Sequence, residues 1–219
     1  MVQSKLLLKF SEITHFFFDK KDCLNLANLP IDIDTCIKVE QIHSNKLAII
    51  NDNSKNYYPI VDGLVTAKKL FLAIKTADCL PILFYEQKQK IFAAVHAGWK
   101  GLYAGIIENT IKTIVNLAGR KADIVCAIGP HIKNCCYDVS FERISQFQKL
   151  GYNVSYISTK RKNSWHLDLG KIAAVQLRRS GISEKNIDII NSCTSCNEKF
   201  CSFRRDKHLS GRMWSVIGR

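Results

Sequence analysis

The chain has 219 residues, 47% of them hydrophobic, and carries a formal net charge of +13 at pH 7. This length and composition suit one domain with a sizeable core, so we expect residues 1–219 to form a single domain. No stretch is long and apolar enough to cross a bilayer, and the first residues lack the features of a signal peptide. We therefore expect a cytosolic protein.

The basic character of the chain raises the question of nucleic-acid binding, because clustered Lys and Arg side chains neutralise phosphates. The basic runs are scattered, however, at residues 68–69, 160–162, 178–179 and 204–205. Nothing resembles an RNP motif, a recognition helix or a basic arm. We favour a basic, solvated surface with one patch for an anionic substrate, and keep a basic RNA-associated protein as the non-enzymatic alternative.

The nine cysteines indicate thiols or metal ligands rather than disulfides. Their number is odd, and Cys23, Cys36 and Cys126 lie inside apolar runs, where a thiol behaves as a small hydrophobe. Structural disulfides are rare in the reducing cytosol.

In chain order, the first predicted elements are two strands at residues 36–42 and 46–50. His43, Ser44 and Asn45 interrupt them, and such residues favour turns or bulges. Residues 61–66 form a predicted turn that enters a strand. Two apolar strands follow, at 80–85 and 91–96, and the polar loop 86–90 joins them as a hairpin.

The second half of the chain alternates helices and strands. Apolar residues recur at helical spacing from 106 to 118, and Gly119 provides a stop. The later elements are a strand at 123–128, a helix from Ser140 to Leu150, a helix capped by Asp168, and a final buried strand at 187–190. Hairpins mixed with strand–helix alternation predict an α+β (mixed α/β) fold of largely antiparallel sheets flanked by helices.

The hairpin brings two metal-binding side chains to one end. If the hairpin turns around Lys88, residues that face each other across the two strands have numbers that sum to about 176. Cys79 then lies close to Ala97, and His96 faces Leu80. Opposed Cβ atoms of an antiparallel pair are about 4.5–5.5 Å apart, which lets a thiolate and an imidazole meet. His43 lies at a comparable break between strands, but spacing alone does not bring it to the hairpin.

Two histidines and one cysteine around Zn²⁺ leave the fourth tetrahedral position open, as in catalytic sites. The soft thiolate also admits copper, which is the alternative metal. A buried thiol and a hydrogen-bonded histidine are the structural alternatives. Without metal, Cys79 and His96 would form the nucleophile–base pair of a cysteine hydrolase or deamidase.

Seven short strings occur in an order that resembles one known family. They are VEQIHSN (39–45), DGLVT (62–66), TADCLP (76–81), AVHAGWKG (94–101), IGP (128–130), CCYDV (135–139) and SFRRD (202–206). Together they resemble the YfiH-type multicopper polyphenol oxidase/laccase-domain family. Its members are mostly described as purine nucleoside phosphorylases with adenosine deaminase and methylthioadenosine phosphorylase activities. The family is also linked to copper-dependent phenol oxidation and to peptidoglycan quality control.

The resemblance implies a zinc site whose ligands map onto His43, Cys79 and His96. It also implies phosphorolysis of adenosine, inosine or methylthioadenosine, with adenosine deamination as a second activity. Only six histidines are present, too few for the several copper centres of a true multicopper oxidase. The region before Thr35 looks shorter than in the family.

Further residues receive roles in this chemistry. We expect Lys100, Arg204 and Arg205 to hold phosphate, because cations suit that anion, and Asn45 to join them as a substrate contact. We expect Asp78, beside a ligand, to act as general acid/base or to orient a ligating histidine. The open zinc position would supply the activated water that deamination requires.

Cys193-x-x-Cys196, followed by Cys201, is a weak signal for a second metal site or a redox motif. A structural zinc site would need a fourth ligand, for which His208 is the nearby candidate. No second C-x-x-C follows, so we favour ordinary thiols. The adjacent pair Cys135-Cys136 is predicted to consist of a core residue and a surface residue.

Overall fold

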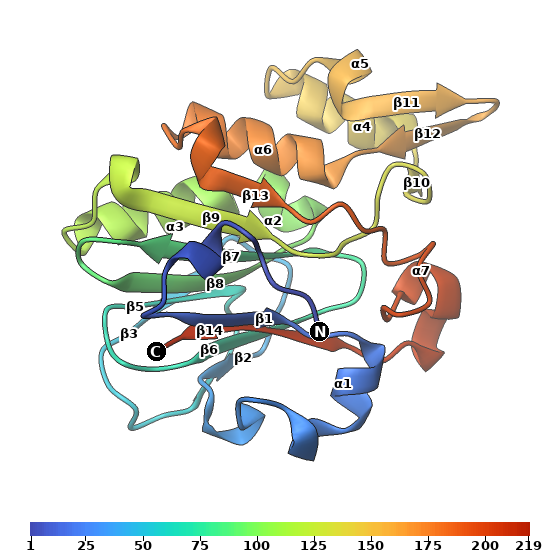
Figure 1. The fold of residues 1–219 in the computed structure, drawn as a ribbon. Helices are drawn as coiled ribbons and strands as arrows, with labels where there is room; N and C mark the ends of the chain where they lie inside the picture. Colours follow the sequence, from blue (N-terminus) through green and yellow to red (C-terminus); the bar gives the residue numbers. More distant parts are fainter.

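A six-stranded sheet forms the centre of the computed structural model, which describes residues 1–219 (Figure 1). Across the sheet the strands are β13 (Ile187–Ile189), β9 (Ile124–Ile128), β7 (Leu80–Glu86), β8 (Ile91–Ala97), β5 (Gly63–Thr66) and β3 (Leu47–Ile50). The edge strands β13 and β3 run parallel to their neighbours, and the other neighbouring pairs are antiparallel. The sheet is therefore mixed and largely antiparallel, as predicted.

Helices cover one face of this sheet. They are α2 (Trp99–Tyr103), α3 (Ile106–Asn116) and α6 (Leu169–Arg179), of which α6 lies above the strands of the sheet in Figure 1. Their apolar sides share a core of 28 buried residues with one face of β7, β8 and β9. The predicted helix at 106–118 is confirmed and ends slightly early. Ala118 adopts a left-handed conformation, φ 68°, and the N–H of Gly119 donates back to the carbonyl of Ile114.

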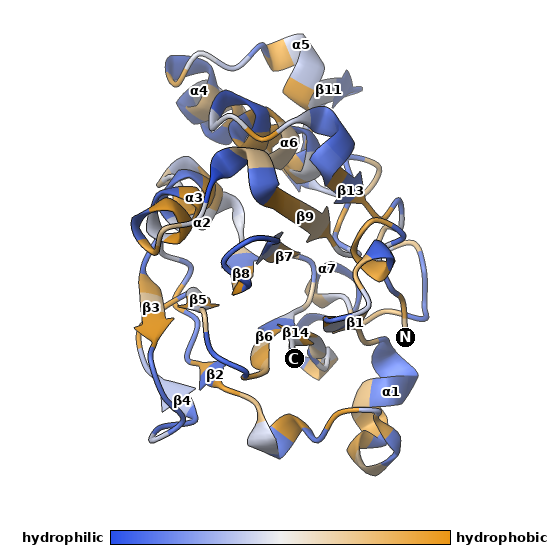
Figure 2. Cartoon of the chain, turned by 60° about the vertical axis from the view of Figure 1, so that its left-hand side comes forward, coloured by the Kyte–Doolittle hydropathy of each residue, from blue (hydrophilic) through white to orange (hydrophobic).

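A smaller antiparallel sheet covers the opposite face. Its strands, in order, are β1 (Thr14–Phe17), β14 (Met213–Gly218) and β6 (Leu72–Thr76), and it shares a second core of 15 buried residues with the central sheet. Every residue of β7 and β8 is buried, since both faces of these strands are covered. That is why they occur as unbroken apolar runs in the sequence. β9 is likewise hydrophobic along its length (Figure 2). The three layers confirm the α+β fold.

The remaining elements lie around these layers. They are a three-stranded sheet of β10 (Asp138–Val139), β12 (Ser164–Leu167) and β11 (Ser158–Arg161), the pair β2 (Lys38–Val39) and β4 (Tyr57–Tyr58), and the helices α1 (Lys20–Leu24), α4 (Phe141–Lys149), α5 (Val154–Ile157) and α7 (Phe203–Asp206). In Figure 1, α4, α5 and β11 lie beyond α6, on the side away from the smaller sheet. No helix combines the length and the apolar character that a membrane span requires.

The predicted hairpin of β7 and β8 is confirmed, but its register is shifted by one residue. Pro81, rather than Leu80, faces His96. The shift arises at the turn, where β7 extends to the buried Glu86. Its carboxylate accepts a hydrogen bond from the N–H of Gln89 at 2.6 Å and so closes a tighter loop than expected.

The smaller sheet is absent from the sequence-based prediction. β14, not β13, is the last strand, and β13 is partly exposed rather than buried. The strand expected at 36–42 is reduced to Lys38–Val39. Beyond it, Ile42, His43 and Ser44 direct their N–H groups to the carboxylate of Asp62 instead of to a neighbouring strand.

Candidate metal centre and its pocket

Three side chains from separate segments converge at the open end of the β7–β8 hairpin. His96 lies near the end of β8, Cys79 precedes β7, and His43 lies between β2 and β3. One ligand atom from each lies within 4.8 Å of the others. The two imidazole rings meet edge to face, with centroids 4.7 Å apart. The structure thus brings together the three residues expected to be ligands, close enough for one ion to contact all of them.

Asp62 shapes the turn that carries His43. Its fully buried carboxylate accepts hydrogen bonds from the N–H of His43 at 2.9 Å and from the N–H of Ser44 at 2.6 Å. The Ser44 hydroxyl donates to it as well, at 2.7 Å. These bonds hold His43 in a left-handed conformation, φ 62°. Such a backbone costs a residue other than glycine about 1–3 kcal/mol and persists only where its surroundings maintain it.

The same carboxylate orients His96. Nδ1 of His96 lies 2.8 Å from Oδ1 of Asp62, and the backbone N–H of His96 donates to the carbonyl of Asp62 at 2.8 Å. An ionised carboxylate only accepts, so Nδ1 carries a proton and Nε2 is the nitrogen that a metal can bind after displacing any proton there. Paired in this way, a histidine is prepared to bind a metal through Nε2. Asp62 received no role from the sequence, where its only signal was its place in the string DGLVT.

The electrostatics of the cluster favour a thiolate. Burial raises the pKa of Cys79, but hydrogen bonds and positive charge from His43 and His96 outweigh burial and lower it to about 6. Burial also opposes a charged His96, yet its bonds to Asp62 and Cys79 raise its pKa to about 9. For Asp62, burial opposes ionisation, while the bonds from His96 and Ser44 lower the pKa to about 2. The thiolate is the form in which cysteine binds a metal.

Gly98 leaves the space in which the cluster forms. In the observed register it stands opposite Cys79, just beyond the last paired residues of the hairpin. A Cβ at this position would lie 3.0 Å from Sγ of Cys79 and 3.0 Å from Cδ2 of His43. The φ of Gly98 is −77°, which any residue can adopt. Glycine is therefore required here for space rather than for backbone freedom.

The three side chains line a pocket of about 520 Å³, a volume that suits a small molecule. Its other walls include three cations and several apolar side chains, among them Lys75, Arg204, Arg212, Ile132, Tyr137 and Phe203. A small molecule in the pocket would reach an ion held by the cluster. Two imidazoles and one thiolate fit a divalent metal with one coordination position left for substrate or water.

Arg204 is the one predicted phosphate contact that lines the pocket. Its guanidinium pairs with the carboxylate of Asp138 and lies 5.2 Å from the ring centre of Tyr137. Arg205 points elsewhere, because its guanidinium donates to the carbonyls of Thr194 and Phe200 and pairs with its own neighbour in the chain. Arg205 therefore holds loops together.

Lys100 and Asn45, also expected to contact substrate, lie outside the pocket lining. Lys100 is exposed on α2, and the Asn45 amide donates to the carbonyl of Ala104 at 2.7 Å. The pocket cations missed from the sequence are Lys75 and Arg212. Neither stands in the seven strings, so only tertiary structure reveals them.

Asp78 lines the pocket, but its carboxylate does not contact a histidine. It accepts from the Thr194 hydroxyl at 2.7 Å and from the N–H of Arg204 at 2.6 Å. Its backbone is left-handed, φ 84°. Asp78 thus ties the start of α7 to the pocket, and the contact with a ligating histidine expected of Asp78 is made by Asp62.

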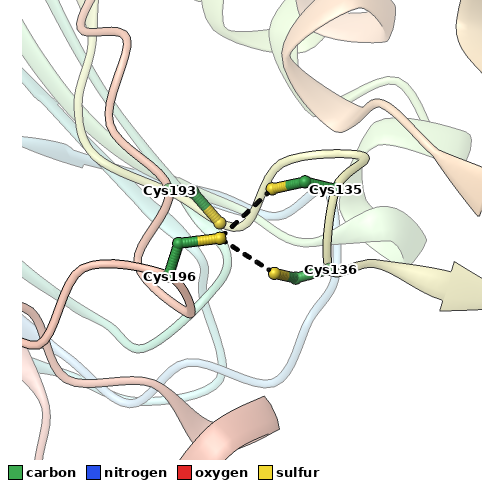
Figure 3. A group of neighbouring side chains, drawn as sticks. All are labelled: Cys135, Cys136, Cys193 and Cys196. Atoms are coloured by element: carbon green, nitrogen blue, oxygen red, sulfur yellow. Dashed lines mark hydrogen bonds between the residues drawn. The ribbon is translucent and has the colours of Figure 1, made fainter.

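The C-x-x-C pair has partners that the sequence did not indicate. Cys193 and Cys196 lie against Cys135 and Cys136, and the four sulfur atoms lie within 4.8 Å of one another (Figure 3). From the sequence we expected ordinary thiols here, and the structure adds that these four lie together. Neither Cys201 nor His208 belongs to it. The two pairs are about 60 residues apart in the chain, beyond the reach of any local spacing rule.

Residues 21–219 match the family described as multi-copper polyphenol oxidoreductase laccase, and the chain belongs to this family. The match covers the metal cluster, the pocket and the four cysteines. It confirms the family resemblance of the seven strings.

Among similar proteins, a purine nucleoside phosphorylase of Clostridium acetobutylicum is 37% identical over 184 residues, which cover 82% of this chain and 75% of that protein. A purine nucleoside phosphorylase of Rickettsia conorii is 31% identical over 214 residues, which cover 91% of this chain and 87% of that protein. The crystal structure of the Bacillus licheniformis hypothetical protein YfiH superposes with a TM-score of 0.82 at 29% identity, covering 90% of this chain and 78% of the other.

Proposed function

We propose that this chain is a cytosolic, zinc-dependent purine nucleoside phosphorylase that acts on adenosine, inosine or methylthioadenosine. The observation that carries the proposal is the cluster of His43, Cys79 and His96 at the wall of a pocket that also presents three cations. The names of the similar proteins from Clostridium acetobutylicum and Rickettsia conorii support the same reaction. In that reaction a phosphate oxygen bonds to C1′ of the sugar while the bond from C1′ to the purine nitrogen breaks.

We assign phosphate binding to the three cations of the pocket, Lys75, Arg204 and Arg212. Lys75 is anchored through its backbone, which exchanges two hydrogen bonds with the side-chain amide of Gln41 at 2.7 and 2.8 Å. The pairing of Arg204 with Asp138 fixes the direction of its guanidinium. Cations held in this way lower the cost of bringing a multiply charged anion out of water.

The purine fits the apolar side of the pocket. Ile132, Tyr137 and Phe203 line it, and aromatic rings offer a flat surface for stacking a base. The departing base takes up a proton, and Asp78 is the carboxyl group in the lining that would deliver it after taking a proton itself. Asp78 also holds the N–H of Arg204, so it joins the proton donor to the phosphate-binding segment.

Zinc suits the donor set of the cluster, and when bound it supplies a Lewis acid with one exchangeable position. Copper is the alternative that a thiolate also admits. His43, Cys79 and His96 would hold the ion, and the contact with Asp62 keeps a proton of His96 on Nδ1. Adenosine deamination is the second activity we propose. In that reaction a water would bond to C6 of the purine instead of a phosphate oxygen bonding to C1′, and the amino group would leave as ammonia.

A metal-free hydrolase is the competing function. The lowered pKa of Cys79 and its two imidazole neighbours also describe a nucleophile–base pair. Chelation separates the two functions. Loss of turnover on removal of zinc supports the metal enzyme, whereas inhibition of metal-free protein by thiol alkylation supports the hydrolase.

The test is a screen of adenosine, inosine and methylthioadenosine with phosphate, in which released base is separated by chromatography. Phenols, cell-wall precursors and RNA serve as the alternative substrates and ligands. We expect base release by the zinc-loaded enzyme and its loss in Cys79→Ser. Lys112→Met is the control, since Lys112 is an exposed residue of α3 outside the pocket. Undiminished phosphorolysis by a folded Cys79→Ser protein that has lost the ion of the His43, Cys79 and His96 site would refute the proposal.

A further inference from the structure

Four cysteine side chains from two distant loops point at one centre (Figure 3). Cys135 and Cys136 lie on the loop that follows β9, and Cys193 and Cys196 lie on the segment that follows β13. Sγ of Cys196 is 3.1 Å from Sγ of Cys136 and 3.4 Å from Sγ of Cys135. All four sulfur atoms lie within 4.8 Å of one another.

These distances fit a metal ion better than a disulfide. A disulfide joins two sulfur atoms at about 2.05 Å and would leave the other two unused. A tetrahedral zinc ion with Zn–S bonds of about 2.3 Å has sulfur atoms separated by about 3.8 Å along each edge. The observed separations, from 3.1 Å up to 4.8 Å at most, bracket that edge. Small rotations of the side chains would complete the tetrahedron.

The backbone around the cysteines is already arranged. The N–H of Lys133 donates to Sγ of Cys193 at 3.4 Å, the kind of hydrogen bond that stabilises a metal thiolate. The turn from Cys193 to Cys196 closes with the N–H of Asn197 donating to the Cys193 carbonyl at 3.0 Å. Arg205 supports the turn by donating to the carbonyl of Thr194 at 2.9 Å.

The charge of the surroundings also fits. Four thiolates around a divalent ion carry a net charge of about −2. Two cations contact the first loop: Arg161 donates to the Cys135 carbonyl at 3.5 Å, and Arg204 donates to the Cys136 carbonyl at 3.2 Å. No carboxylate belongs to the cluster. Hard cations such as Ca²⁺ and Mg²⁺ prefer oxygen ligands, so they are excluded as the bound ion.

We propose that Cys135, Cys136, Cys193 and Cys196 bind a second metal ion, zinc, in a closed site of four thiolates. Each thiol releases its proton to solvent as the ion binds. With no open position, the site is structural. It joins the loop after β9 to the segment after β13.

The two joined segments carry one wall of the pocket. The first supplies Ile132 and Tyr137, and the second continues into α7, which supplies Phe203 and Arg204. The hydrogen bond from Arg204 to the Cys136 carbonyl crosses directly between them. The second zinc therefore holds this wall of the pocket in place, although none of its four ligands lines the pocket.

Metal analysis of the full chain, purified under reducing conditions and freed of loose metal, tests the proposal. We expect two zinc ions per chain in the wild type, one in Cys196→Ser, one in Cys79→Ser, and two in the control Cys201→Ser, whose buried thiol lies outside both clusters. The ion kept by Cys79→Ser should, after exchange for cobalt, give the intense charge-transfer absorption of a four-thiolate site.

A single zinc per wild-type chain that disappears in Cys79→Ser would overturn the inference, as would a Cys136–Cys196 disulfide found by mass spectrometry in the functional protein. If Cys196→Ser does not fold, the wild-type zinc count and the cobalt spectrum of Cys79→Ser still decide. The inference is independent of the proposed function. Zinc in the four-cysteine site of a chain without phosphorolysis would refute only that function.

Discussion

Replacing Asp62 with asparagine changes one oxygen of a buried carboxylate into an N–H₂ group with almost no change in volume. The carboxylate accepts from the N–H groups of His43 and Ser44, from the Ser44 hydroxyl and from Nδ1 of His96. If the amide oxygen keeps the two bonds from Ser44, the amide nitrogen faces two donors, the N–H of His43 and the Nδ1–H of His96. A donor cannot satisfy a donor.

The conflict is relieved when the proton of His96 moves to Nε2, the nitrogen that would bind the metal. Loss of a partner that orients a ligating histidine lowers metal affinity by about 10–100-fold, or about 1.4–2.7 kcal/mol. The unpaired N–H of His43 adds about 1–3 kcal/mol of destabilisation, because a buried donor without an acceptor loses its hydration. Asp62→Asn should therefore lower both zinc affinity and unfolding free energy.

Competition with a chromophoric chelator measures the zinc affinity, and urea denaturation measures the stability. Asp52→Asn is the control, because Asp52 is an exposed carboxylate that belongs to neither the cluster nor the pocket lining. A folded Asp62→Asn protein that binds zinc at the site as tightly as the wild type would refute the role assigned to Asp62.

Three further perturbations test separate parts of the structure. Gly98→Ala places a methyl group 3.0 Å from Sγ of Cys79 and should lower zinc affinity in the same chelator competition while the fold persists; unchanged affinity would show that the space is not needed. Lys75→Ala should raise the KM for phosphate by about tenfold, because Lys75 lines the pocket. Lys100→Ala should leave this KM unaltered, because Lys100 lies outside the lining. A raised KM in Lys100→Ala but not in Lys75→Ala would favour the assignment made from the sequence. Burial lowers the pKa of His15 from 6.5 to about 4, so between these pH values the unfolded chain binds a proton that the native state excludes. Stability should fall on acidification by up to about 1.4 kcal/mol per pH unit from this group, and urea titrations at pH 7 and pH 5 should show a smaller loss in His15→Gln.

Local pattern was sufficient for much of the fold. The helix at Ile106–Asn116 and the hairpin of β7 and β8 follow from the spacing of apolar residues and from a polar loop, which act between near neighbours in the chain. Even there, the register depended on the buried side chain of Glu86 at the turn. The smaller sheet escaped prediction because β14 pairs with β1 and β6, far away in the chain.

The candidate site likewise combines one local contact with contacts between segments that are far apart in the chain. Cys79 and His96 meet because a hairpin closes between them, a local event that the sequence alone determined. The arrival of His43 required a buried Asp62 to collect the N–H groups of a distant turn. The pocket cations Lys75 and Arg212 come from β6 and from the segment before β14, which only the second sheet brings together.

The four-cysteine cluster belongs wholly to the tertiary structure. The sequence displayed Cys193-x-x-Cys196 and Cys135-Cys136 as two unrelated signals. They meet because β13 pairs with β9 in parallel, so the loops that follow these two strands leave the central sheet at the same end. The sequence by itself determined the donor types and the local elements. The distances between donors were decided by strand pairing and layer packing, because contacts between segments far apart in the chain form only when the whole core closes.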